Sequence, residues 1–146
     1  RHDRLSVTTF VRSQDMVLGF PYDVFHWTLL QENVAKVLGV GLGDYTHIMS
    51  SCHVYDKDFG LAERIVDEHC VVGVPMIPID RDFFEVRDKL IASERAVRVD
   101  GVIKATGSIF WDNFIVAANR RNNGGNDAIT DFGLRFLCDR RKELMK

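Results

Sequence analysis

A strand pattern near the start of the chain, followed closely by a long helix pattern, constrains the fold more than any other feature of this sequence. Polar and aliphatic residues alternate over residues 5–11, which is the period of a β-strand, and Arg12 falls on the face opposite the aliphatic side chains. Gly19 then interrupts the chain, and Pro21 suits the first turn of a helix that the glycine at position 39 ends. The apolar positions of this helix, which we expect to face the core, are Val24, Trp27, Leu30, Val34 and Val37.

Further strand and helix patterns follow along the chain. Residues 44–55 mix β-branched, aromatic and small side chains and predict a second strand. Helices are predicted over residues 59–70, 81–98, 107–121 and 127–145, and residues 71–79 suit either a strand or extended chain. The pattern predicts an α/β (α+β) fold. A length of 146 residues with 46% hydrophobic content suits a single domain over residues 1–146.

Charge and hydropathy exclude several classes of partner. A formal net charge of −2 and a pI of about 6.2 leave no basic excess to neutralise phosphates, so we expect no nucleic-acid binding. The longest mostly apolar run, residues 71–79, is too short to span a bilayer, and no signal peptide or anchor is visible. We therefore expect no membrane association.

Cysteine and histidine usage predicts neither a disulfide framework nor a metal site, and favours a reducing, cytoplasmic compartment. None of these residues has the spacing of metal ligands. They are Cys52, Cys70, Cys138, His26, His47 and His69.

Arg12 and Ser13 follow the first strand directly. A guanidinium group offers a planar fork of donors and a hydroxyl adds a third, so this pair can hold a phosphate. For the pair alone, an ordinary surface arginine beside a polar residue is the more common explanation. The surrounding sequence has to decide between these interpretations.

The stretch RSQDMVLGFPYD, residues 12–23, resembles the nucleotide-binding segment of the thymidylate synthase family, which reads Arg-Ser-x-Asp-x-x-Leu-Gly-x-Pro-Phe-Asn before a long helix. The spacing agrees without a gap. The Gly-Asp and His-x-Tyr of the family also recur at their usual interval, as Gly43-Asp44 and His53-Val54-Tyr55. The resemblance covers roughly residues 4–56, and the later sequence departs from the family pattern.

Several residue roles are implied by this resemblance. Arg12 and Ser13 would bind the 5′-phosphate of a pyrimidine nucleoside monophosphate, and His53 and Tyr55 would hold a sugar hydroxyl common to ribose and deoxyribose. Asp15 resembles the residue whose main chain meets the 2-carbonyl of the base. The positions that line the folate side of the family's cavity are Leu18, Gly19 and Tyr22, the last standing where the family usually has Phe.

Asp23 occupies the place where uracil-specific members carry Asn. Uracil presents a donor at N3 and an acceptor at O4, whereas cytosine presents an acceptor at N3 and an amino donor at C4. A carboxylate accepts from that amino group, so Asp23 favours a cytidine nucleotide, as in the cytidylate hydroxymethylase branch of the family. The alternative is that Asp23 only complements the dipole of the helix that begins nearby.

In the family reaction a cysteine thiolate adds to C6 of the pyrimidine and C5 then attacks 5,10-methylenetetrahydrofolate. The resemblance places this nucleophile upstream of Arg1, so we expect either the C-terminal part of a longer enzyme or a half-length relative without catalysis. Cys52-His53 resembles the Cys-His of the family nucleophile. The register assigns His53 to the sugar site instead and leaves Cys52 as a buried strand residue of low reactivity.

The resemblance implies a mixed sheet packed against a long helix and a homodimer formed through the sheet. The C-terminal part departs from the family pattern, and the predicted helices 81–98 and 127–145 either replace the family's usual terminal segment or form an interface. We expect a transferase that hydroxymethylates C5 of CMP or dCMP. Two alternatives remain open, namely methylation of a uridine nucleotide (dUMP) as in a thymidylate synthase, and a nucleotide-binding or assembly module without catalysis.

Overall fold

The computed structural model describes residues 3–67 and 76–123. The contacts divide the chain into two compact units, Arg1–Val72 and Gly73–Lys146. The first unit contains β1 (Arg4–Val11), β2 (Gln14–Asp15), α1 (Gly19–Leu38), β3 (Gly41–Met49), β4 (Cys52–His53), a 3-10 turn at Asp56–Asp58 and α2 (Phe59–Asp67). The second contains α3 (Phe83–Asp100) and α4 (Ile109–Asn123).

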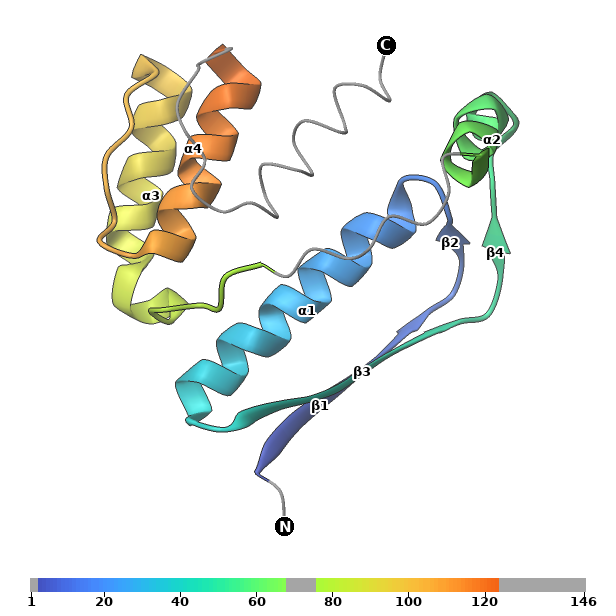
Figure 1. Ribbon diagram of the computed structural model, residues 1–146, viewed down its shortest axis with the longest axis horizontal. Coiled ribbons are helices and arrows are strands. Elements are labelled where there is room, and N and C mark those ends of the chain that lie inside the picture. Colours follow the sequence, from blue (N-terminus) through green and yellow to red (C-terminus); the bar gives the residue numbers. More distant parts are fainter. Residues whose placement is uncertain (1–2, 68–75, 124–146) are drawn as a thin grey trace. The chain divides into compact units, whose positions relative to one another are not determined.

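The first unit is built around a β1–α1–β3 crossover, which Figure 1 shows with α1 lying along the two strands. β1 pairs in parallel with β3, and β2 pairs in parallel with β4. The predicted α/β class with a long helix across the strands is confirmed, although both described strand pairs are parallel where a mixed sheet was expected. The predicted second strand is divided into β3 and β4, because Ser50 and Ser51 interrupt it.

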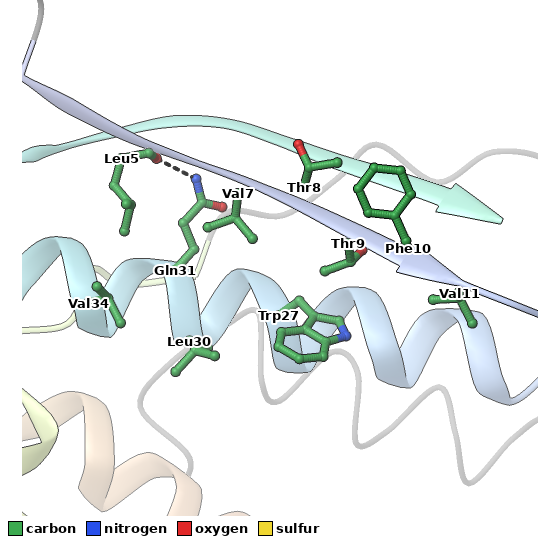
Figure 2. A pocket seen from close by; sticks show the side chains of 10 residues that line it. All are labelled: Leu5, Val7, Thr8, Thr9, Phe10, Val11, Trp27, Leu30, Gln31 and Val34. Atoms are coloured by element: carbon green, nitrogen blue, oxygen red, sulfur yellow. Dashed lines mark hydrogen bonds between the residues drawn. The ribbon is translucent and has the colours of Figure 1, made fainter.

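A bulge in β3 fixes the register of the crossover. Leu5 lies opposite Leu42 and Val7 lies opposite Tyr45, so β3 has one residue more than β1 over this interval. The Gln31 side chain of α1, 4% exposed, donates its amide to the carbonyl oxygen of Leu5 at 2.8 Å (Figure 2). The same amide also lies 3.2 Å from the carbonyl oxygen of Gly43. This amide satisfies backbone groups that the bulge leaves without a strand partner.

The helix α1 was predicted correctly, but its buried face was not. It ends at Gly39, whose φ of 66° lies in the left-handed region that glycine favours. Its buried residues are Gln31, Asn33 and Ala35. Four of the five apolar positions that were expected in the core are 38% to 50% exposed. They are Trp27, Leu30, Val34 and Val37. The requirement for an amide at the bulge turns the Gln31 side of the helix towards the strands.

The second unit is a helical hairpin with its own apolar core. The predicted helices 81–98 and 107–121 are confirmed as α3 and α4, which pack against each other (Figure 1). The side chain of Asp82 caps α3 by accepting from two backbone N–H groups, and Gly101, with a φ of 67°, ends the helix. The core residues are Ile79, Val86, Ala96, Val97, Phe110, Trp111 and Ile115.

Some predicted elements fall wholly or partly outside the described residues. The helix predicted over 127–145 lies outside them, as does the end of the helix predicted over 59–70, whose first part is α2. Of the stretch 71–79, the described residues 76–79 form neither helix nor strand. Among the helices that the structure describes, none has the length and apolar character needed to cross a membrane.

Asp80 caps α4 from a distant part of the sequence. Its carboxylate accepts from the Ser108 hydroxyl at 2.5 Å and from the backbone N–H groups of Ile109 and Phe110 at 3.0 and 3.3 Å. Partial burial acts to raise the pKa of Asp80, but these three donors together outweigh it and leave the pKa lowered. The carboxylate therefore stabilises the helix start in its charged form.

Replacing Asp80 by Asn should destabilise the second unit in a pH-dependent way. Because the folded-state pKa is lowered, the stabilisation is present above the unfolded value of about 3.9 and is lost as the pH falls through the folded-state pKa. We expect Asp80→Asn to lower the free energy of unfolding by about 0.5–2 kcal/mol at neutral pH and by less in acid. The free energy of unfolding is measured by urea denaturation at several pH values, monitored by Trp111 fluorescence in a Trp27→Phe background.

The matched control for this experiment is Asp88→Asn, because Asp88 is an exposed carboxylate of α3 that pairs with its sequence neighbour Arg87. A difference between wild type and Asp80→Asn that stayed constant from neutral to acidic pH would contradict the capping role.

Candidate functional site

A polar cluster gathers where β1 and β3 end and β2 and β4 begin. Arg12 and Ser13 lie in the break between β1 and β2 and are both exposed. The Ser51 hydroxyl lies 3.3 Å from that of Ser13, which in turn lies 3.4 Å from Nδ1 of His53. In the described part of the chain no carboxylate pairs with the Arg12 guanidinium. The cluster therefore brings two hydroxyls and an imidazole together beside the backbone of Arg12, whose carbonyl oxygen lies 3.5 Å from the Ser51 hydroxyl, and hydroxyl donors of this kind suit an anion.

His53 and Tyr55 form the next part of this cluster. Their rings meet edge to face with centroids 4.7 Å apart, and Lys57 Nζ lies 5.8 Å from the centroid of the Tyr55 ring. Lys57 and Ser51 were not singled out from the sequence. Ser51 lies beside Ser13 because β4 pairs with β2, and Lys57 lies against Tyr55 because the 3-10 turn directly follows Tyr55.

Asp15 holds the loop between β2 and α1 in place. Its carboxylate accepts from the backbone N–H groups of Val17, Leu18 and Gly19 at 3.0–3.2 Å. The Val17 hydrogen bond contributes most to lowering the pKa of Asp15; partial burial opposes it, and the other two N–H groups and the charge of His53 add to the lowering.

The main chain of Asp15 points away from β4. Gln14 and Met16 donate their N–H groups to Ser51 and His53 of the neighbouring segment, at 3.0 and 2.9 Å. Successive peptide groups of a strand alternate in direction, so the N–H and C=O of Asp15 face the opposite side. The N–H and C=O groups of Asp15 are therefore not used in the pairing with β4.

Asp23, in the second turn of α1, is half-buried and does not project freely into solvent. Its Oδ2 accepts from the side-chain amide of Gln14 at 2.9 Å. Gln14 is 2% exposed, so this bond is shielded from water and joins β2 to α1. The Gln14 contact occupies one carboxylate oxygen and leaves Oδ1 as the second acceptor of Asp23.

The contact with Gln14 continues into a chain of hydrogen bonds that crosses the sheet. The Oε1 atom of Gln14 lies 3.2 Å from Nε2 of His47. Nδ1 of His47 lies 2.7 Å from the Tyr45 hydroxyl and 3.0 Å from the Thr9 hydroxyl, and these two hydroxyls are 3.0 Å apart. The polar chain therefore runs from Thr9 on β1 through β3 to Asp23.

Sequence reasoning did not find this hydrogen-bonded chain. Gln14 is the variable position of the Arg-Ser-x-Asp motif, and His47 was considered only as a metal ligand. The period of two places Tyr45 and His47 on one face of β3, and the parallel register places Thr9 beside His47. The alternation signal was thus present, but the pairing with α1 was needed to complete the chain.

The residues expected on the folate side lie at the start of α1: Leu18 and Gly19 are about one turn before Asp23, and Tyr22 directly precedes it. Leu18 and Tyr22 are 41% and 43% exposed. Gly19 packs closely, because a Cβ atom built on it would lie 3.0 Å from Nε2 of Gln14. A larger residue at position 19 would displace the amide that holds Asp23.

Cys52 is exposed, which corrects the expectation that it is buried. It precedes His53 on β4, and consecutive strand residues point to opposite faces. The Cys52 thiol is therefore directed away from the face on which His53 contacts Ser13.

A separate apolar groove of about 500 Å³ runs along β1 and α1 (Figure 2). None of the residues of the polar cluster lines it. The groove exposes apolar surface and offers no charged group, so it does not suit a nucleotide phosphate. Its lining residues include Val7, Phe10, Trp27, Leu30 and Val34.

Comparison with known proteins identifies the family of this chain. A family model described as Thymidylate synthase matches residues 1–92, which is more than half of the chain. This chain belongs to the thymidylate synthase family. The match includes the polar cluster, Asp23 and part of α3.

Individual thymidylate synthases match over a shorter stretch. Those of Bacillus licheniformis and Bacillus subtilis (strain 168) are 40% identical over 57 residues, or 39% of this chain and 20% of each relative. A thymidylate synthase of Bacillus phage phi3T is 39% identical over the same length. The matched part thus spans about a fifth of the length of these relatives.

Proposed function

We propose that this protein takes part in transfer of a one-carbon unit to C5 of a cytidine monophosphate, CMP or dCMP, to give the 5-hydroxymethyl nucleotide. The observation that carries the proposal is the Asp23 carboxylate, which is held by Gln14 at 2.9 Å in a segment matched by the thymidylate synthase family. The same segment carries Arg12, whose guanidinium pairs with no carboxylate of the described residues.

The proposed base contact follows from hydrogen-bonding capacity. A carboxylate only accepts, and the amino group at C4 of cytosine donates, so Oδ1 of Asp23 can bind that amino group. The O4 atom of uracil is an acceptor and would face the carboxylate without a hydrogen between them. A mismatch of this kind costs about 1–3 kcal/mol in a buried site.

The rest of the nucleotide would lie along the polar cluster. Arg12 and Ser13 would bind the phosphate, and His53 with Tyr55 would hold a sugar hydroxyl. The Asp15 main chain, which faces away from β4, would meet the 2-carbonyl of the base. These assignments are supported by the short contacts that link Ser13, His53 and Ser51.

The one-carbon donor we propose is 5,10-methylenetetrahydrofolate, which supplies the carbon atom that becomes attached to C5. The exposed side chains of Leu18 and Tyr22 fit such a group, because an apolar and an aromatic surface can pack against a flat heterocycle. Gly19 lies between them in the sequence and leaves room for close approach.

A thiol is also required, and Cys52 is the only cysteine among the described residues. Its direction away from the polar cluster argues against it as the nucleophile. The described residues are therefore proposed to bind and orient the nucleotide, while the covalent step is not assigned to them.

A second candidate is C5 methylation of a uridine nucleotide. It is favoured by the names of the matched relatives, which are thymidylate synthases. The two candidates share the phosphate and sugar contacts and differ in the base that position 23 binds, so a base-selectivity measurement separates them.

We also propose a homodimer that forms through the sheet, over the exposed apolar side chains of β1 and β3. Phe10 and Ile48 lie opposite each other in the register and are 76% and 44% exposed. Apolar side chains of this size on a sheet surface are typical of a covered interface.

The base proposal predicts that wild type binds CMP more tightly than UMP and that Asp23→Asn reverses this preference. Loss of the carboxylate should weaken CMP binding by about 5- to 150-fold, which corresponds to about 1–3 kcal/mol. Isothermal titration calorimetry measures the affinity of wild type and of Asp23→Asn for both nucleotides. Asp44→Asn, at an exposed position of β3, is the matched control, and equal affinities for both bases in wild type and Asp23→Asn would contradict the proposal.

The proposed chemistry predicts release of tritium from CMP labelled at C5 when methylenetetrahydrofolate is added, because the new bond replaces the C5–H bond. The nucleotide product should carry one hydroxymethyl group, which mass spectrometry identifies. A methylated uridine product would support the second candidate instead. Binding without tritium release would support a nucleotide-binding role without catalysis.

A further inference from the structure

We propose that Gln14 and His47 are specificity-determining positioning residues, which act through Asp23 by fixing which of its atoms faces the base. This inference rests on the proposed function. Gln14 is too deeply buried, at 2% exposure, to touch a nucleotide itself, and His47 lies behind it. Neither residue was assigned a role by the family motif.

The direction of each hydrogen bond in the chain follows from the group at its end. An ionised carboxylate cannot donate, so at the 2.9 Å contact the Gln14 nitrogen donates to Oδ2 of Asp23. The amide oxygen of Gln14 therefore faces Nε2 of His47 at 3.2 Å. Because an amide oxygen only accepts, Nε2 of His47 carries the hydrogen.

The far end of the chain is consistent with that tautomer. With its hydrogen on Nε2, a neutral imidazole accepts at Nδ1, and the Tyr45 hydroxyl lies 2.7 Å from this atom. The Thr9 hydroxyl lies 3.0 Å from both the Tyr45 oxygen and Nδ1 and can donate to either. When Thr9 donates to the Tyr45 oxygen and Tyr45 donates to Nδ1 of His47, every donor from Thr9 onwards points towards Asp23, and bonds ordered in one direction reinforce one another.

Packing holds the two middle groups in this orientation. The Phe20 ring lies edge to face against His47, with centroids 5.3 Å apart. On the other side, the lack of a side chain at Gly19 lets the Gln14 amide approach, since a Cβ there would be 3.0 Å from Nε2. An amide that is oriented by His47 and enclosed in this way cannot turn over without losing both hydrogen bonds.

This fixed amide determines what position 23 presents to a ligand. Gln14 presents an N–H group, so it requires an acceptor on its side of residue 23. For Asp the second oxygen remains available, which is an acceptor for the cytosine amino group. For Asn the oxygen would turn to Gln14 and the NH2 group would remain, which is a donor for O4 of uracil. Gln14 therefore sharpens the base preference of either residue.

The test is a double-mutant cycle with Gln14→Met and Asp23→Asn, read out as the ratio of CMP to UMP affinity by calorimetry. Methionine keeps a similar length and removes the donor. In the wild-type background Gln14→Met should lower the CMP/UMP ratio by about 5- to 10-fold. In the Asp23→Asn background it should raise the same ratio, because the NH2 group is no longer held towards the base.

If Gln14 had only a structural role, Gln14→Met would weaken the binding of CMP and UMP alike. Its effect on the CMP/UMP affinity ratio would then not change sign between the two backgrounds. An unchanged ratio in both backgrounds, or a change of the same sign in both, would therefore overturn the inference. Thr46→Val is the matched control, because Thr46 lies on the same strand as His47 and is exposed on the opposite face. It should leave the ratio unaltered.

A second measurement applies if Gln14→Met does not fold. The 15N chemical shifts of the His47 ring in the wild-type protein, in mildly alkaline buffer, should be those of the Nε2–H tautomer. A ring with its hydrogen on Nδ1 would overturn the inference. If wild type prefers CMP but the double-mutant cycle shows no coupling, only this inference fails. If wild type binds neither nucleotide although His47 has the expected tautomer, the proposed function fails, and this inference fails with it.

Discussion

The hydrogen bond between Gln14 and Asp23 is the interaction on which the candidate site depends. It joins the short strand β2 to the first part of α1 at 2.9 Å and is shielded because Gln14 is buried. Without this hydrogen bond, the half-buried side chain of Asp23 could adopt several rotamers. With it, one carboxylate oxygen is occupied and the other is presented on a fixed side, close to the loop that Asp15 orders.

The crossover of the first unit creates the conditions for this contact. Parallel pairing brings the ends of β1 and β3 to the same edge, so that Arg12 and Ser13 meet Ser51 and His53 there. The bulge in β3 sets the register that places Thr9 beside His47, and Gln31 stabilises the bulge from α1. A one-residue change of register would turn His47 to the opposite face and break the chain to Asp23.

The sequence was sufficient for the main elements of the first unit. Alternation over residues 5–11 and the helical period after Pro21 located β1 and α1, and the family spacing singled out Arg12, Ser13 and Asp23 as candidate site residues. It could not reveal that Gln31 would be buried against the strands while Trp27, one turn away on the same side of α1, stays 40% exposed, because the bulge that binds the amide is a tertiary feature. The partnership of Gln14 with His47 likewise depends on register, which periodicity alone does not supply.

The most direct test of the proposed base contact is a crystal structure of the protein with bound CMP. We predict that the amino nitrogen of cytosine lies within about 2.7–3.2 Å of the Asp23 oxygen that Gln14 does not contact. The phosphate should then lie on Arg12 and Ser13. A base that stacks elsewhere while Asp23 faces solvent, or a phosphate bound away from Arg12, would contradict the proposed contact.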